Sequence, residues 1–181
     1  MKSLHTIQVL AKVGKVISTV LFILCIVGAC LSLAGVICLL SGFEAIEIGN
    51  VTLRSIIETN SDILMPALYG SLISGVVLCI AEAVISKYAE IYFKHELEAG
   101  DPFTFEGADE LKHVGIMAIV VSLAAQILLS IGLAVASGYM KGINEISTGE
   151  FNSIGIGIML IVISVFFRYG AETKENRQEN E

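Results

Sequence analysis

The residues that most often do chemistry in proteins occur here without the spacing that such chemistry requires. The four cysteines lie inside apolar runs and lack the C-x-x-C spacing of zinc and redox sites; they are Cys25, Cys30, Cys38 and Cys79. The sequence contains no H-E-x-x-H, no G-x-S-x-G and no glycine-rich phosphate-binding motif. We therefore expect no metal, no cofactor and no enzymatic activity.

Glu82 is the carboxylate that lies deepest among apolar residues. It directly follows an uncharged run and stands five residues before Lys87, so its side chain could extend to water at the end of that run. We expect a structural pair between Glu82 and Arg168. A role for Glu82 in proton or ion handling is the alternative.

A stripe of small and polar residues recurs every four positions farther along the chain. Its members are Ser122, Gln126, Ser130, Ala134 and Gly138. Small residues let helices approach closely in a membrane, and hydroxyl or amide groups can form hydrogen bonds between helices. The stripe therefore predicts a packed helix face, with a polar pore or cavity lining as the alternative.

The elements that position these residues follow from composition. Hydrophobic residues make up 55% of the 181 and charged residues 16%, against about 25% charged in soluble domains. Such a composition excludes a water-soluble globular enzyme, a disordered chain and a secreted disulfide scaffold. Uncharged runs cover 16–43, 63–81, 114–140 and 151–167, and a membrane-spanning helix needs about 20 apolar residues.

These runs predict an all-α membrane protein with four transmembrane helices in an antiparallel bundle. The expected helices cover about 12–41, 63–98, 105–140 and 151–170, within a single domain of residues 1–170. A cleaved signal sequence is the less favoured interpretation of the first run, because that run stays apolar through Leu40. The segment 42–62 mixes apolar and acidic residues, which predicts a short helix at the membrane interface.

The second helix is expected to extend beyond the membrane into the cytoplasm. Residues 63–98 contain no break after Pro66, and they would form a helix about 54 Å long against a bilayer core of about 30 Å. Gly100 and Pro102 are typical of a helix end, and Thr104 is a suitable N-cap for the next helix.

The basic residues predict the orientation. Nine of the eleven Lys and Arg residues fall on the side of the two termini and the middle loop, and the positive-inside rule places that side in the cytoplasm. The net charge of −7 argues against direct nucleic-acid binding. Many of the acidic residues fall in the cytoplasmic segment 88–112 and in the tail 171–181, which we expect to be disordered.

Two short motifs resemble a known family. Gly100-Asp101-Pro102-Phe103-Thr104 and the segment Phe166 to Glu175 are similar to the loop junction and closing pattern of bacterial membrane proteins called domain of unknown function 2975. The resemblance implies a bacterial cytoplasmic-membrane protein without established activity. It also implies, by association, a cytoplasmic regulator of the helix-turn-helix type as partner. Family members tend to be basic after the junction, whereas Asp109 and Glu110 follow here.

Two functions remain open. The first is a non-enzymatic interaction or regulatory component that engages a cytoplasmic partner or a second copy of itself. The alternative is a small oligomeric transport, channel or toxin-immunity subunit. Residues 101–104 could serve as structural caps or as a docking site. The candidate structural or docking residues are Glu82, Tyr88, Tyr92, Asp101, Pro102, Phe103, Thr104, Gln126 and Arg168.

Overall fold

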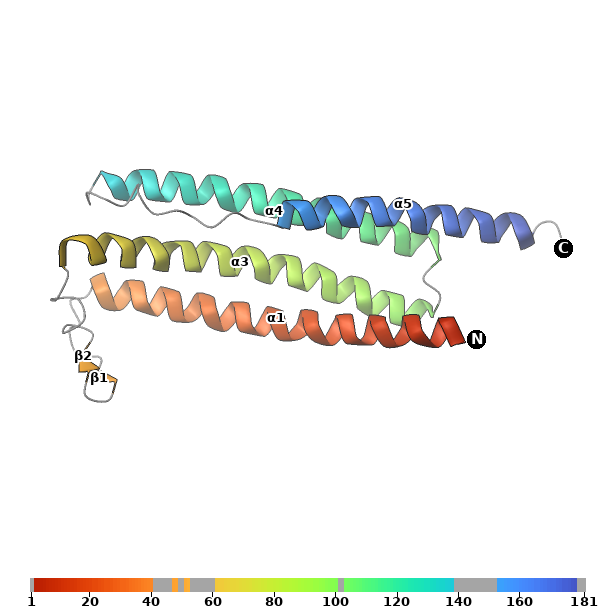
Figure 1. Ribbon diagram of the computed structural model, residues 1–181, viewed down its shortest axis with the longest axis horizontal. Helices are drawn as coiled ribbons and strands as arrows, with labels where there is room; N and C mark the ends of the chain where they lie inside the picture. The colour runs from red at the N-terminus through yellow and green to blue at the C-terminus, as the bar shows by residue number, and fades with distance from the viewer. Residues whose placement is uncertain are drawn as a thin grey trace. The chain divides into compact units, whose positions relative to one another are not determined.

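The computed structural model is built from long helices (Figure 1). It describes the backbone of residues 2–40, 47–48, 51–52, 61–100, 103–138 and 153–178, and the side chains of 8–38, 68–100, 103–138 and 153–177. The elements are α1 (Lys2–Leu40), β1 (Glu47–Ile48), β2 (Val51–Thr52), α3 (Ser61–Ala99), α4 (Phe105–Ser137) and α5 (Ser153–Gln178).

All four helices are long and apolar enough to cross a membrane. They contain 39, 39, 33 and 26 residues, and the most apolar window of each has a mean hydropathy of 2.0 or more. Large apolar side chains cover their outer surfaces, for example Leu24 at 59% exposure and Leu128 at 59%. Such surfaces suit lipid rather than water. The predicted all-helical fold with four candidate spans is confirmed.

The turn between α3 and α4 uses the end signals that the sequence contains. Gly100 has a φ of +70°, a conformation that favours glycine, and its amide donates a hydrogen bond to the Glu96 carbonyl at 3.1 Å. The Thr104 hydroxyl accepts a hydrogen bond from the Gly107 amide at 3.0 Å. Thr104 is therefore the N-cap of α4, as predicted. Asp101 and Pro102 lie outside the described residues.

Contacts divide the chain into two compact units where the sequence predicted a single domain. The first unit contains Met1–Leu24, Ala81–Ala124 and Phe151–Glu181, and the second contains Cys25–Ile80 and Ala125–Glu150. A helix of 39 residues is about 58 Å long. Because contacts near one end of such a helix do not reach the other end, each end packs with its own neighbours.

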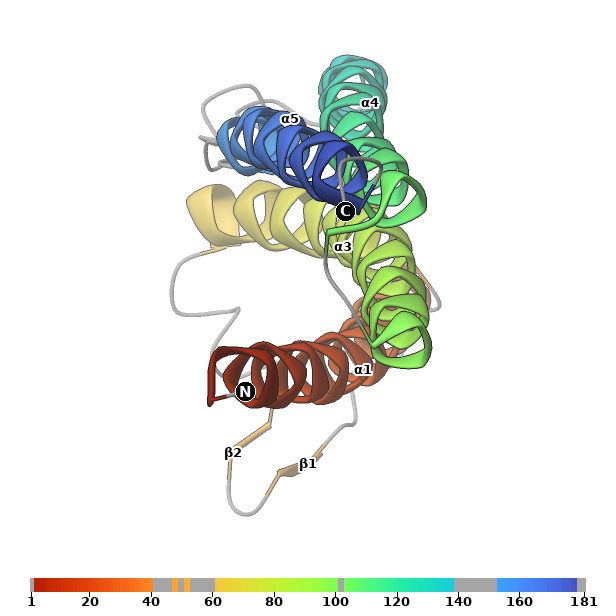
Figure 2. The ribbon, with the colours of Figure 1, turned by 90° about the vertical axis from the view of Figure 1, so that its right-hand side faces the viewer.

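The first unit has a small core where α3, α4 and α5 meet. Its buried members are Tyr92, Leu111 and Val114, and they are flanked by Ala89, Phe93, Leu160 and Phe167. In this unit α4 and α5 lie side by side (Figures 1 and 2), with Gly115 against Gly157. Phe93 of α3 also fills the space beside Gly14 of α1. The missing side chain of a glycine therefore lets the backbone of the neighbouring helix approach at Gly115 and Gly157, and an aromatic ring approach at Gly14.

In the second unit, α1 and α3 pack through small residues. A Cβ added to Gly75 would lie 2.8 Å from the Ser32 hydroxyl, and one added to Gly28 would lie 3.0 Å from Cys79 Sγ. Residue numbers rise along α1 as they fall along α3, so the paired segments run in opposite directions. This contact fits the use of small residues where helices meet in a membrane.

The segment between α1 and α3 contains two short strands in its described part. β1 and β2 pair in antiparallel fashion, with Glu47 opposite Thr52 and Ile48 opposite Val51. The expected interfacial helix does not include Val51. Residues 53–60, where the rest of that helix was expected, lie outside the described residues.

α5 continues eight residues beyond the predicted boundary at 170, to Gln178. The expected disorder from residue 171 is therefore wrong as far as Gln178. The sequence after Gly170 contains no further Gly or Pro and is rich in helix-forming Ala, Glu, Lys and Arg. Arg168 also lies 3.7 Å from Glu172, one turn later on the same helix.

Candidate functional site

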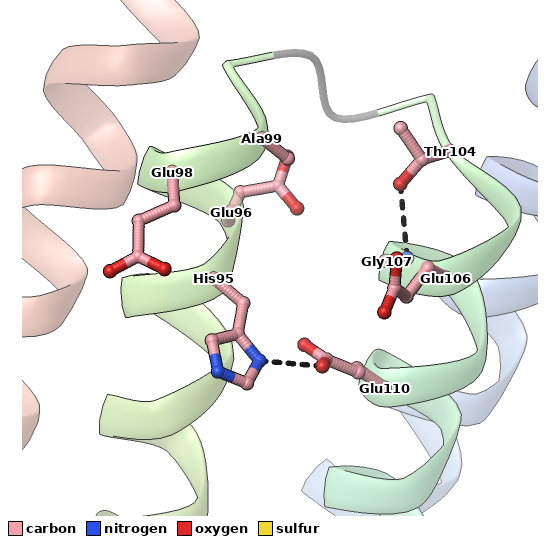
Figure 3. Close-up of a pocket in the computed structure, with 8 residues that line it drawn as sticks. All are labelled: His95, Glu96, Glu98, Ala99, Thr104, Glu106, Gly107 and Glu110. Atoms are coloured by element: carbon pink, nitrogen blue, oxygen red, sulfur yellow. Dashed lines mark hydrogen bonds and ion pairs between the residues drawn. The ribbon is translucent and has the colours of Figure 1, made fainter.

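A cleft opens where the end of α3 faces the beginning of α4 (Figure 3). Its volume is about 290 Å³. It is lined by His95, Glu96, Glu98 and Ala99 from α3 and by Thr104, Glu106, Gly107 and Glu110 from the α4 side. The two caps of the turn place these residues opposite one another, because α3 ends before Gly100 and α4 restarts directly after Thr104.

A hydrogen bond crosses the cleft between His95 and Glu110. The His95 Nδ1 and Glu110 Oε1 atoms are 2.6 Å apart, and the side chains are 50% and 30% exposed (Figure 3). Sequence reasoning missed this pair because the residues are fifteen positions apart. A signal was present, however. His95 stands five residues before Gly100 and Glu110 stands six after Thr104, so a tight turn brings them to the same level.

The cleft is strongly acidic. Four glutamates line it, and Glu96 is buried at 8% exposure. Lys94 forms an ion pair with Glu98 at 3.9 Å, and the pair is weak because both groups are well exposed. A concave surface lined by one sign of charge concentrates the opposite charge. The cleft therefore suits a cationic group.

Exposed aromatic side chains stand beside the acidic cleft. Phe103 and Phe105 flank the N-cap of α4 and are 40% and 39% exposed. Phe103 is also anchored, because its ring meets that of Phe167 edge-on with centroids 5.6 Å apart. A Cβ on Gly170 would lie 2.6 Å from the Phe103 ring. Phe103 thus packs against α5 through Phe167 and Gly170, and part of its ring stays exposed on the surface.

The two tyrosines predicted as docking residues have different surroundings. Tyr92 is 7% exposed and lies in the core with Leu111 and Val114, which fits the structural role of the two roles that the sequence left open. Tyr88 stands one turn earlier and is 40% exposed. A step of four residues exceeds one helical turn of 3.6 residues, so Tyr88 and Tyr92 point in directions about 40° apart. This rotation leaves Tyr88 exposed while Tyr92 is buried.

The predicted pair between Glu82 and Arg168 is wrong. Glu82 Oε1 accepts a hydrogen bond from the Ser153 hydroxyl at 3.1 Å. Arg168 instead lies 3.7 Å from Asp109. Ser153 and Arg168 are fifteen residues apart on α5, about 22 Å of helix, so a carboxylate beside the first cannot reach the second.

The predicted packed stripe has one buried member, Ser122. Ser122 is completely buried, and its hydroxyl donates to the Ala118 carbonyl of its own helix at 2.6 Å. Gln126 and Ser130 are exposed. Steps of four residues rotate by about 40° per step around an α-helix, so the stripe leaves the buried face. The buried positions follow one step of three with two steps of four, through Leu111, Val114, Ala118, Ser122, Ala125, Leu129 and Leu133.

The described residues contain no group of three His, Cys, Asp or Glu side chains that could hold a metal ion. All four cysteines lie within the described helices, and none of them forms a disulfide. Comparisons of the chain with protein-family models, with curated proteins and with solved structures found no match. The resemblance of the two junction motifs to the bacterial family therefore stays a prediction.

Proposed function

We propose that this chain is a multi-pass protein of the bacterial cytoplasmic membrane with both termini in the cytoplasm. The excess of Lys and Arg on the side of the termini supports this orientation. Contacts within the units support an antiparallel arrangement of neighbouring helices, since Gly14 meets Phe93 in the first unit and Gly35 meets Leu72 in the second. Lipid would then cover the apolar outer surfaces.

In this proposal the part of α3 that extends into the cytoplasm is shorter than the charged segment that begins at Glu82. Lys87 lies over the Phe22 ring, 5.3 Å from its centroid. Phe22 stands seven residues after Lys15, about 10 Å deeper along α1. Because α1 is uncharged from Val16 onward, we place the cytoplasmic edge of the membrane at the level of Lys15 and Phe93 rather than at Lys87. Only the last turns of α3 then project from the membrane.

We further propose that the projecting end binds a cytoplasmic protein. The observation that carries this proposal is the acidic cleft beside exposed aromatic rings, at the end where α3 turns into α4. A protein with a basic segment would match the carboxylates, and an apolar residue of that segment could pack on Phe103 or Phe105. The family resemblance suggests a regulator of the helix-turn-helix type for this role.

Photo-crosslinking in native membranes tests the proposal. A benzophenone amino acid at Phe105, 39% exposed, should capture one cytoplasmic protein, whereas the same probe at Ile127, 60% exposed in an apolar run, should not. The captured band is then identified by mass spectrometry. Capture of this chain alone would indicate a homo-oligomer, and capture of no protein would refute the proposal.

Charge variants separate specific docking from general acidity. Glu98→Gln with Glu106→Gln neutralises two residues of the cleft, and both are exposed. Glu172→Gln with Glu175→Gln removes the same charge from exposed positions outside it. Capture should fall at least several-fold with the first pair and change little with the second. Equal effects of the two pairs would refute docking in the cleft.

One observation favours the alternative of a transport or channel subunit. Lys87 Nζ and Glu90 Oε2 form an ion pair at 2.9 Å, at a level of α3 that lies beside the uncharged part of α1. Ionisable groups at membrane depth often mark ion pathways. Flux into liposomes that is lost with Glu90→Gln but kept with Glu98→Gln would support this function. Equal flux with the wild type and with protein-free liposomes would exclude it.

A further inference from the structure

A second groove lies on the first unit between α1 and the end of α3. Its volume is about 520 Å³, and it is lined by Lys12, Lys15, Val16, Thr19, Val20 and Leu97. The two lysines are three residues apart, and Val16 and Val20 follow at steps of four from Lys12. One end of the groove is therefore cationic and the other end is apolar.

The cationic end has positive charge that carboxylates do not fully neutralise. Among the described side chains, Lys87 and Lys94 form ion pairs with Glu90 and Glu98, whereas neither Lys12 nor Lys15 lies within ion-pair distance of a carboxylate. Glu90 is an acidic group that acts on this end, since it interacts with Lys15 and with Thr19. It is also held by Lys87. An anion at Lys12 and Lys15 would therefore meet net positive charge.

The apolar end continues directly into the uncharged run of α1. Val16 and Val20 are 56% and 48% exposed, and the run that they begin extends to residue 43. The groove thus lies where headgroups give way to acyl chains in a bilayer that α1 spans. A free phosphate would use only the lysines, and a soluble acidic protein could not follow the valines into lipid.

We propose that this groove binds an anionic phospholipid. The phosphate and headgroup lie between Lys12 and Lys15, and the first part of an acyl chain lies along Val16 and Val20. Leu97 closes the side formed by α3. This site is separate from the acidic cleft and does not depend on a cytoplasmic partner.

Lipid binding by the purified protein tests the proposal. Native mass spectrometry in detergent measures the binding of phosphatidylglycerol and of phosphatidylcholine. The wild type should bind the anionic lipid preferentially. Lys12→Gln with Lys15→Gln should reduce that preference by about 25-fold, from about fivefold for each lysine. Lys94→Gln with Lys112→Gln removes the same charge outside the groove and should change it less than about twofold.

Several outcomes would overturn the proposal. Equal binding of the two lipids by the wild type would do so without any variant, so the test does not depend on how a variant folds. An equal loss in both lysine pairs would show general charge attraction. Displacement of the lipid by inorganic phosphate or glycerol phosphate would show an anion site that does not use the valines. A dimer that excludes lipid would make a second copy the occupant.

Discussion

Gly115 of α4 and Gly157 of α5 allow two helix backbones to touch, and replacing either by alanine should separate them. A Cβ at residue 115 would lie 2.8 Å from the Gly157 carbonyl oxygen, and one at residue 157 would lie 2.7 Å from the Gly115 carbonyl oxygen. Ordinary contacts begin near 3.4 Å. The Cβ of each alanine is therefore about 0.6–0.7 Å too close to a backbone atom, which cannot rotate away as a side chain can.

The expected cost follows from two opposing effects. Overpacking of a tight contact destabilises a protein by about 1–3 kcal/mol. Gly→Ala inside a helix contributes about 1 kcal/mol of stabilisation. The net loss for Gly115→Ala should be about 0–2 kcal/mol in the free energy of unfolding. Gly132→Ala is the matched control, because a Cβ there meets nothing within 4 Å, and it should stabilise α4 slightly.

Unfolding in mixed micelles with increasing denaturing detergent, followed by circular dichroism, measures the difference. Gly115→Ala and Gly132→Ala should differ by about 1–3 kcal/mol, the cost of overpacking at position 115. The double variant with Gly157→Ala should lose less than the sum of the single losses, since helices that have already moved apart accommodate the second Cβ. Equal stability of the variants at positions 115 and 132 would refute the packing of α4 on α5.

Three further predictions use the same unfolding assay. Tyr92→Ala should cost about 3–5 kcal/mol because it empties the core, whereas Tyr88→Ala should cost less than about 1 kcal/mol; similar losses would contradict their different burial. Thr104→Ala should cost about 1 kcal/mol through loss of the N-cap, and Thr104→Ser should restore most of it. The losses in the free energy of unfolding from Glu82→Gln and Arg168→Gln should add within about 0.5 kcal/mol in the double variant. A larger coupling would show that the two side chains do form the pair predicted from the sequence.

The sequence by itself determined the class of the protein and the ends of its central helices. Length without charge is a local property, so the four apolar runs identify the candidate spans independently of packing. Capping is local as well. Gly100 and Thr104 act on groups within a few residues of their own positions. Gly100 ends α3 and Thr104 begins α4, each where the sequence predicts.

Tertiary structure decided which polar groups meet and which faces are buried. The sequence does not show how far one helix is shifted along another. It therefore allowed the prediction that Glu82 pairs with Arg168, whereas the structure places Ser153 beside Glu82. The His95–Glu110 bond depends on the exact turn between α3 and α4. Rotation about each axis is set by contacts with neighbours, and this rotation places Tyr92 in the core while Gln126 faces outward. Local chemistry fixes a helix, whereas register and rotation come from the helices that pack against it.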